Sequence, residues 1–171
     1  VLGKMSLEIQ DATGKRMTEL GPAKAKGINV VDWNFSTKPP KVATGKTFTF
    51  GGFTTPRVPA GTYKVVIQKG KETYTEELVV QYDPKSIISL ADRKAQEAAT
   101  RKMFDMTQEL AYMVYTMDEY MKMAEQAKAK NPNAINPLLT EFKKLTETLV
   151  VTKGDNYVGA AEPQLRDKMT D

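Results

Sequence analysis

The hydrophobic period of the chain changes at Asp83-Pro84, and this change limits the fold more than any other feature. Before it, short runs of alternating apolar and polar residues are separated by turn signals about every 8 to 12 residues, as in an antiparallel β-sandwich. After it, apolar residues recur at steps of three and four, as on one face of a helix. We therefore predict a segregated α+β chain, with a β-sandwich in residues 1–84 and an antiparallel bundle of about three helices in residues 85–171.

The strand predictions rest on this alternation and on the turns between the runs. Turns are expected at 11–14 and at Lys69-Gly70, where a glycine can take a positive φ. Trp33 is expected to anchor the core. Residues 42–59 are harder to assign, because Gly51-Gly52 and Pro56 interrupt a segment that otherwise suits a strand at 47–50. The other expected strands are residues 5–10, 15–20, 28–35, 62–68 and 72–81.

The helical half begins with a variant of the capping box, in which Ser89 caps the first turn and Asp92 lies within it. From there to about Lys130 the chain has neither proline nor glycine, which predicts one helix far longer than average that packs on partners along its length. Its apolar face is expected to hold Ala95, Ala99, Met103, Met106, Leu110, Met113, Met117, Met121 and Ala124.

Proline and asparagine residues mark where the long helix is expected to end and where the remaining helices are expected to begin. Asn131-Pro132-Asn133 is expected to end the long helix. A second helix is predicted over residues 137–149, with Leu138, Leu139, Phe142, Leu145 and Leu149 on one face. A third, shortened by the end of the sequence, is predicted from residue 164, after Pro163.

Cysteine and histidine are both absent, which excludes whole classes of chemistry. The chain has no disulfide, no thiol or imidazole catalyst, and no thiolate or imidazole ligand for a metal. Its 25 basic residues are interleaved with 21 acidic ones, so the net charge of +4 is interpreted as a solvated surface and no nucleic-acid partner is expected. No apolar run reaches the roughly 20 residues that cross a bilayer, so no membrane span is expected.

The two ends of the sequence look internal to a longer polypeptide. Residues 1–14 lack the basic and apolar regions of a signal peptide. We interpret Val1 and Asp171 as processing points or cut ends rather than natural termini.

Aromatic residues supply the candidate ligand or interface positions. Phe48, Phe50 and Phe53 suit an exposed platform of the kind on which sugars stack, but they also suit a loop folded over the core. Tyr112, Tyr115 and Tyr120 form a band on the long helix that could dock a partner or line the edge of the bundle.

The methionines of the long helix have three possible roles: a bundle core, which we favour, an adaptable groove, or a soft-metal site. They are Met103, Met106, Met113, Met117, Met121 and Met123. Neither adjacent carboxylate pair, Asp118-Glu119 or Glu76-Glu77, suits glycoside hydrolysis, because the two side chains of each pair diverge. We therefore predict no catalytic residue, no cofactor and no metal ligand in this chain.

Four segments, taken in order, resemble a known arrangement: I-Q-D-A-T-G-K at 9–15, A-K-G-I-N-V-V-D-W-N at 25–34, P-A-G-T-Y-K-V at 59–65 and Q-Y-D-P-K at 81–85. The first three resemble the immunoglobulin-like fold of the flagellar hook-assembly type. With the helices that follow, nearly the whole chain resembles the C-terminal region of bacterial sortilin-like, BNR-repeat "glycosyl hydrolase" proteins. The resemblance implies a secreted or periplasmic setting and an N-terminal β-propeller on the same polypeptide, which would hold any hydrolase site.

The leading functional prediction is therefore a non-catalytic structural or interaction module that docks on, or spaces, that propeller. The alternative is a carbohydrate-binding module that assists a glycoside hydrolase, with polysaccharide as its partner and residues 48–53 as its platform. The oligomeric state does not follow from the sequence.

Overall fold

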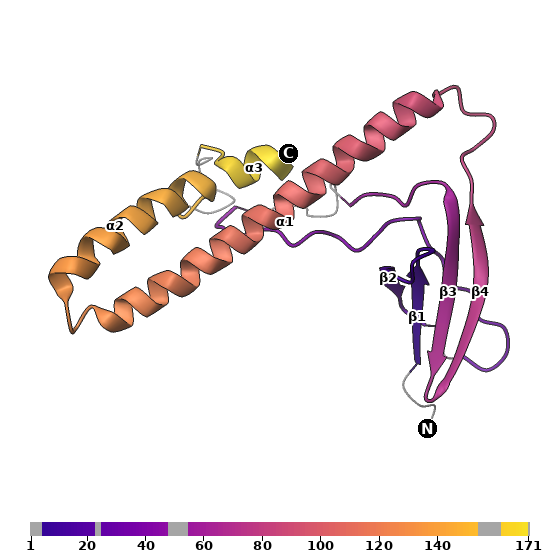
Figure 1. Cartoon of the computed structure of the whole chain (residues 1–171), viewed down its shortest axis with the longest axis horizontal. Helices are drawn as coiled ribbons and strands as arrows, with labels where there is room; N and C mark the ends of the chain where they lie inside the picture. Colours follow the sequence, from indigo (N-terminus) through magenta and orange to yellow (C-terminus); the bar gives the residue numbers. More distant parts are fainter. Residues whose placement is uncertain (1–4, 23–24, 48–54, 154–161, 171) are drawn as a thin grey trace. The chain divides into compact units, whose positions relative to one another are not determined.

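The computed structural model describes residues 5–22, 25–47, 55–153 and 162–170. The chain divides into two compact units. The first combines Val1–Pro39 with Thr55–Ala99, and the second combines Pro40–Thr54 with Thr100–Asp171. Residues 40–47 therefore belong with the helices, although the chain on both sides of this insert belongs with the sheet. A four-stranded antiparallel sheet followed by three helices confirms the α+β prediction at this level (Figure 1).

The sheet has the strand order β2-β1-β3-β4, and every neighbouring pair is antiparallel. Its strands are β1 (Met5–Gln10), β2 (Arg16–Leu20), β3 (Gly61–Lys69) and β4 (Glu72–Val80), each within a residue or so of a predicted strand. The Asp11 carboxylate closes the first hairpin, because its Oδ1 accepts from the backbone N of Thr13 at 2.9 Å and of Lys15 at 3.0 Å. Gly70, with φ 60°, turns the chain from β3 into β4.

One face of the sheet is apolar and the other polar. Ile9, Val58 and Tyr63 are buried together, with Leu7, Val65 and Leu78 among the half-buried residues packed on them. The opposite face carries charged residues such as Glu8 and Lys64, which alternate with the core positions. This alternation explains why the strands were readable in the sequence.

The predicted strand at 28–35 is wrong, since these residues pair with no strand. The chain instead turns at its end: Phe35 has φ 63°, and the side chain of Asn34 accepts from the N–H of Ser36 at 3.1 Å. Such an Asx turn competes with an extended ladder. Trp33 still packs against the core as expected, with its ring centroid 6.4 Å from that of Tyr63.

The helices are α1 (Leu90–Ala127), α2 (Pro132–Leu149) and α3 (Leu165–Thr170). The long helix was predicted to within a few residues. The second helix begins five residues before the expected Pro137, because Asn131 caps it by accepting from Ala134 N at 3.3 Å and Pro132 suits its first turn. Pro137 consequently lies inside α2.

The buried face of α1 differs from the predicted one. Thr107, Leu110, Val114, Met117 and Ala124 are buried, whereas Met106, Met113 and Met123 are exposed large hydrophobic residues. Of the six α1 methionines, only Met117 is buried in the core, so the prediction of a methionine core holds for that residue alone. The predicted apolar face of α2 is likewise divided: Leu139 is buried, but Leu138 and Leu145 are exposed.

Candidate interaction groove

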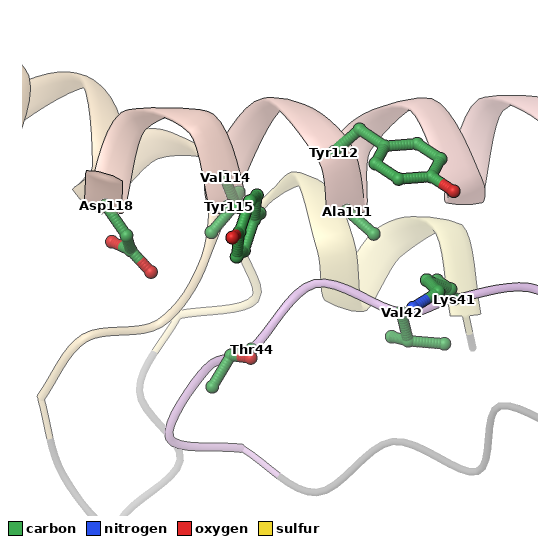
Figure 2. A pocket seen from close by; sticks show the side chains of 8 residues that line it. All are labelled: Lys41, Val42, Thr44, Ala111, Tyr112, Val114, Tyr115 and Asp118. Atoms are coloured by element: carbon green, nitrogen blue, oxygen red, sulfur yellow. The ribbon is translucent and has the colours of Figure 1, made fainter. Parts of the chain in front are cut away.

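A groove of about 270 Å³ lies between the middle of α1 and residues 41–44, both in the second unit (Figure 2). It is lined by Lys41, Val42, Thr44, Ala111, Tyr112, Val114, Tyr115 and Asp118. Two of the three predicted interface tyrosines are thus brought together in one site. The opposite wall is an extended segment of the chain, which the sequence left without an assignment.

The groove wall is fixed by a small apolar core. Ala43, Leu110, Val114 and Val150 are buried together, with Ala111, Leu149 and Met169 packed on them. Ala43 therefore holds its neighbours Val42 and Thr44 against α1, and the backbone N of Lys46 donates to Val151 O at 2.8 Å. Apolar burial and one main-chain hydrogen bond together place this wall.

Arg166 of α3 holds the same wall in place through hydrogen bonds to its backbone. Its side chain is almost fully buried, and the residue is 2% exposed. Nη1 donates to the carbonyl oxygen of Ala43 at 3.1 Å, and Nη2 donates to the carbonyl oxygen of Thr47 at 2.7 Å and to its hydroxyl oxygen. A buried guanidinium needs such partners for its donors, and here the wall supplies them.

Asp167 completes this buried cluster. Its Oδ1 lies 2.9 Å from Arg166 Nη2 and accepts from the Thr47 hydroxyl at 2.6 Å, while its Oδ2 accepts from Gln164 N at 3.0 Å. Burial opposes the charged form, but the hydrogen bonds from Thr47, Arg166 and Gln164 outweigh it and lower the pKa of Asp167. The cluster therefore holds a carboxylate.

The backbone of Gly45 lies against the guanidinium group of Arg166. A Cβ at this position would lie 2.6 Å from Arg166 Nη1 and 2.8 Å from Cζ. Only glycine fits there without displacing the buried guanidinium. Sequence reasoning missed Arg166 and Asp167, because adjacent charges in a short helix look like surface residues. It missed the packing role of Gly45, because this glycine lies in a segment with no periodicity.

The two groove tyrosines present their rings to solvent. Tyr112 is 53% exposed and Tyr115 is 63% exposed. Figure 2 shows Asp118 and Tyr115 near one end of the groove and Lys41 with Tyr112 near the other, all projecting from α1 or from the facing segment. The groove therefore presents exposed aromatic rings, with the acidic Asp118 near one end and the basic Lys41 near the other.

The other predicted interface residues lie elsewhere. Tyr120 does not line the groove, and its ring stacks on Phe142 of α2 with centroids 6.5 Å apart. A second, shallower hollow follows one side of α2, where Phe142 lies between the exposed Leu138 and Leu145. Phe48, Phe50 and Phe53 lie outside the described residues.

The described residues bring together no group of three or more acidic side chains that could hold a metal ion. Glu76 and Glu77 pair with Val65 and Lys64 on β3, so their side chains point to opposite faces of the sheet. The groove has one carboxylate, Asp118, among its lining residues.

Comparison with protein-family models, with curated proteins and with solved structures finds no match for this chain. No helix in the described part of the chain is long and apolar enough to cross a membrane.

Proposed function

We propose that this chain is a non-catalytic interaction module that docks a protein partner through the groove on α1. The observation that carries this proposal is the exposure of Tyr112 and Tyr115 beside a wall held in place by buried contacts. Tyrosine is enriched in protein interfaces, because its rigid ring offers a large contact area at little entropic cost. A fixed wall also reduces the ordering cost of binding.

Exposed apolar surface on α2 supports a docking role. Leu138 and Leu145 are 46% and 50% exposed, on the same side of the helix as Phe142. Apolar clusters of this kind mark interaction surfaces more often than scattered single residues do. The second unit therefore offers a partner two features, the aromatic groove on α1 and these apolar residues of α2.

The partner that we propose is an N-terminal β-propeller of the same polypeptide, as the resemblance to sortilin-like BNR-repeat proteins implies. That resemblance also underlies the finer parts of this proposal: an immunoglobulin-like sandwich, a three-helix bundle and a secreted or periplasmic location. The packing of Trp33 and Val58 on the apolar face of the sheet is consistent with a second layer.

The proposal is tested by mixing the chain with the separately prepared propeller and measuring binding by calorimetry. We expect saturable binding that Tyr115→Ala weakens by roughly tenfold, whereas Tyr74→Ala leaves it within about twofold. Tyr74 is a matched control, because it is 54% exposed but lies on β4. No binding by the folded chain, or equal weakening by both variants, would reject this docking surface.

A polysaccharide ligand is the second candidate, since exposed tyrosines beside Asp118 and Lys41 also suit a sugar. A panel of soluble polysaccharides, titrated against the same variants, separates the two proposals. Binding of a polysaccharide that is lost in Tyr115→Ala would favour the carbohydrate-binding function over protein docking.

A further inference from the structure

Among the described residues, the sheet of the first unit ends on one side at β4 (Figure 1). All nine residues of β4 pair with β3, and the pairing has no register shift. Residues 72–77 are all exposed. A long, regular and exposed edge strand is a template on which a further strand can pair.

The hairpin turn shows which backbone groups of β4 point away from the sheet. Only Gly70 and Lys71 separate the paired residues Lys69 and Glu72, which therefore form the hydrogen-bonded pair that closes a two-residue turn. Hydrogen-bonded and non-hydrogen-bonded pairs then alternate along the two strands. The N–H and C=O groups of residues 73, 75, 77 and 79 thus point away from β3, and in the described part of the chain no turn or loop bonds to them.

The opposite edge of the sheet is protected against pairing. β2 has only five residues, and its register with β1 shifts between Ile9 and Gln10. The backbone N of Lys38 donates to Met17 O at 3.0 Å, so another segment of the chain already bonds to this edge. Short length, a bulge and a covering segment all hinder pairing with other chains. Within the described residues, β4 has none of these three features.

The charges of β4 indicate which kind of strand it accepts. Its charged residues are all acidic: Glu72, Glu76 and Glu77. Lys64 of β3 lies opposite Glu77, but within the described residues neither Glu76 nor Glu77 forms an ion pair. The side chains of Glu76 and Glu77 point to opposite faces of the sheet. Two consecutive basic residues on a neighbouring strand alternate in the same way, so one would lie beside each carboxylate.

The same charges disfavour pairing with a second copy of the chain. Antiparallel pairing of two β4 strands along their full length would place Glu76 opposite the Glu76 of the second copy. Like charges directly opposite each other destabilise a strand pair. The edge therefore discriminates against its own copy and in favour of a basic strand.

We infer that the edge of β4 binds an extended segment of another protein that carries two consecutive basic residues, and adds this segment to the four-stranded sheet. Main-chain hydrogen bonds along residues 73–79 supply the affinity, and Glu76 and Glu77 select the basic pair. This inference goes beyond the proposed docking function, because β4 belongs to the first unit and the groove to the second.

The test is a titration of the intact chain with the blocked peptide Thr-Val-Thr-Lys-Arg-Thr-Val-Thr, followed by calorimetry and by amide hydrogen exchange. We expect saturable binding that slows exchange at Thr73, Thr75 and Glu77, because a paired strand bonds the N–H groups that point away from β3. Binding that leaves exchange at these three amides unchanged would overturn the inference, since the peptide would then not extend the sheet.

Two variants separate the role of the charges from that of the backbone. The double variant Glu76→Lys with Glu77→Lys should weaken binding by roughly tenfold. Its matched control is Asp105→Lys with Glu109→Lys, the same change of charge at exposed residues of α1, which should leave binding within about twofold. Thr75→Pro keeps every charge but removes an N–H that points away from β3, so it should also weaken binding by roughly tenfold.

An exchange of charge makes the test specific. The double variant of Glu76 and Glu77 should bind a peptide with two glutamates in place of the basic pair, and the unaltered chain should not bind it. No binding of the basic peptide by the folded chain overturns the inference. Unchanged affinity in the double variant, or in Thr75→Pro, overturns it as well.

Discussion

Arg166 donates a hydrogen bond of 3.1 Å to the carbonyl oxygen of Ala43, although the two residues are 123 positions apart. This bond joins the short C-terminal helix to the wall of the groove. The wall carries Val42 and Thr44 on either side of Ala43, so the shape of the candidate site depends on a residue that does not line it. Arg166 is therefore a positioning residue for the groove.

Replacing Arg166 by alanine should destabilise the second unit by about 3–5 kcal/mol, because it leaves the Asp167 carboxylate buried without its cation. Urea unfolding followed by helical circular dichroism measures this. Lys144→Ala is the control: its pair with Glu141 is exposed and should contribute at most about 1 kcal/mol. Similar small effects for both variants would mean that the Arg166 cluster does not stabilise the fold.

Removing both partners tests the same cluster in another way. The double variant Arg166→Met with Asp167→Leu leaves no buried charge and should be less destabilised than Arg166→Ala alone. A double variant that is as unstable as the sum of its two single variants would indicate that the two residues do not interact.

The second unit should lose stability in acid. Its Asp167 has a lower pKa when folded than the ordinary value of about 3.9, because the hydrogen bonds from Thr47, Arg166 and Gln164 outweigh burial. The contribution is complete above pH 4 or so and is lost as the pH falls toward the folded pKa. Asp167→Asn should flatten this part of the pH profile, and an unchanged profile in this variant would contradict the role given to Asp167.

Gly45→Ala should destabilise the second unit by about 1–3 kcal/mol, because its Cβ would lie 2.6 Å from the buried Arg166 Nη1. Gly21→Ala is the matched control, since a Cβ there meets nothing within 4 Å. Thermal unfolding of both variants makes the comparison. Equal stability would show that the Arg166 side chain does not pass beside Gly45.

In the sheet, Ile9→Ala should cost about 2–5 kcal/mol, because Ile9 is 2% exposed and packs with Val58 and Tyr63. Val79→Ala, at 55% exposure on β4, should change the stability by roughly 0.5 kcal/mol or less. Chemical denaturation followed by Trp33 fluorescence reports on this unit, since Trp33 packs on the same cluster. A small effect of Ile9→Ala would argue against this core.

The elements that could be predicted are those whose pattern of apolar and polar residues is visible within a short stretch of the sequence. The alternation in β1, β3 and β4 and the run without proline or glycine in α1 were sufficient to locate these elements. The error at 28–35 has a local cause too, because the turn at Asn34–Ser36 competes with a strand that β-branched residues would otherwise favour.

The groove itself could be predicted only in part. Tyr112 and Tyr115, which line the groove, could be proposed as interface candidates from their residue type and their spacing on a helix. Their opposite wall could not, because residues 41–47 have no periodicity and are held by α3 through contacts that span about 120 positions. Sequence spacing carries no signal for such long-range hydrogen bonds.

The most direct test of the docking account is hydroxyl-radical footprinting of Tyr112 and Tyr115 in the isolated chain and in the proposed longer polypeptide that carries the propeller. Docking predicts that both tyrosines react readily in the isolated chain and are several-fold protected in the longer polypeptide, while Tyr74 on β4 reacts equally in the two. Equal reactivity of Tyr112 and Tyr115 in both forms would contradict the account.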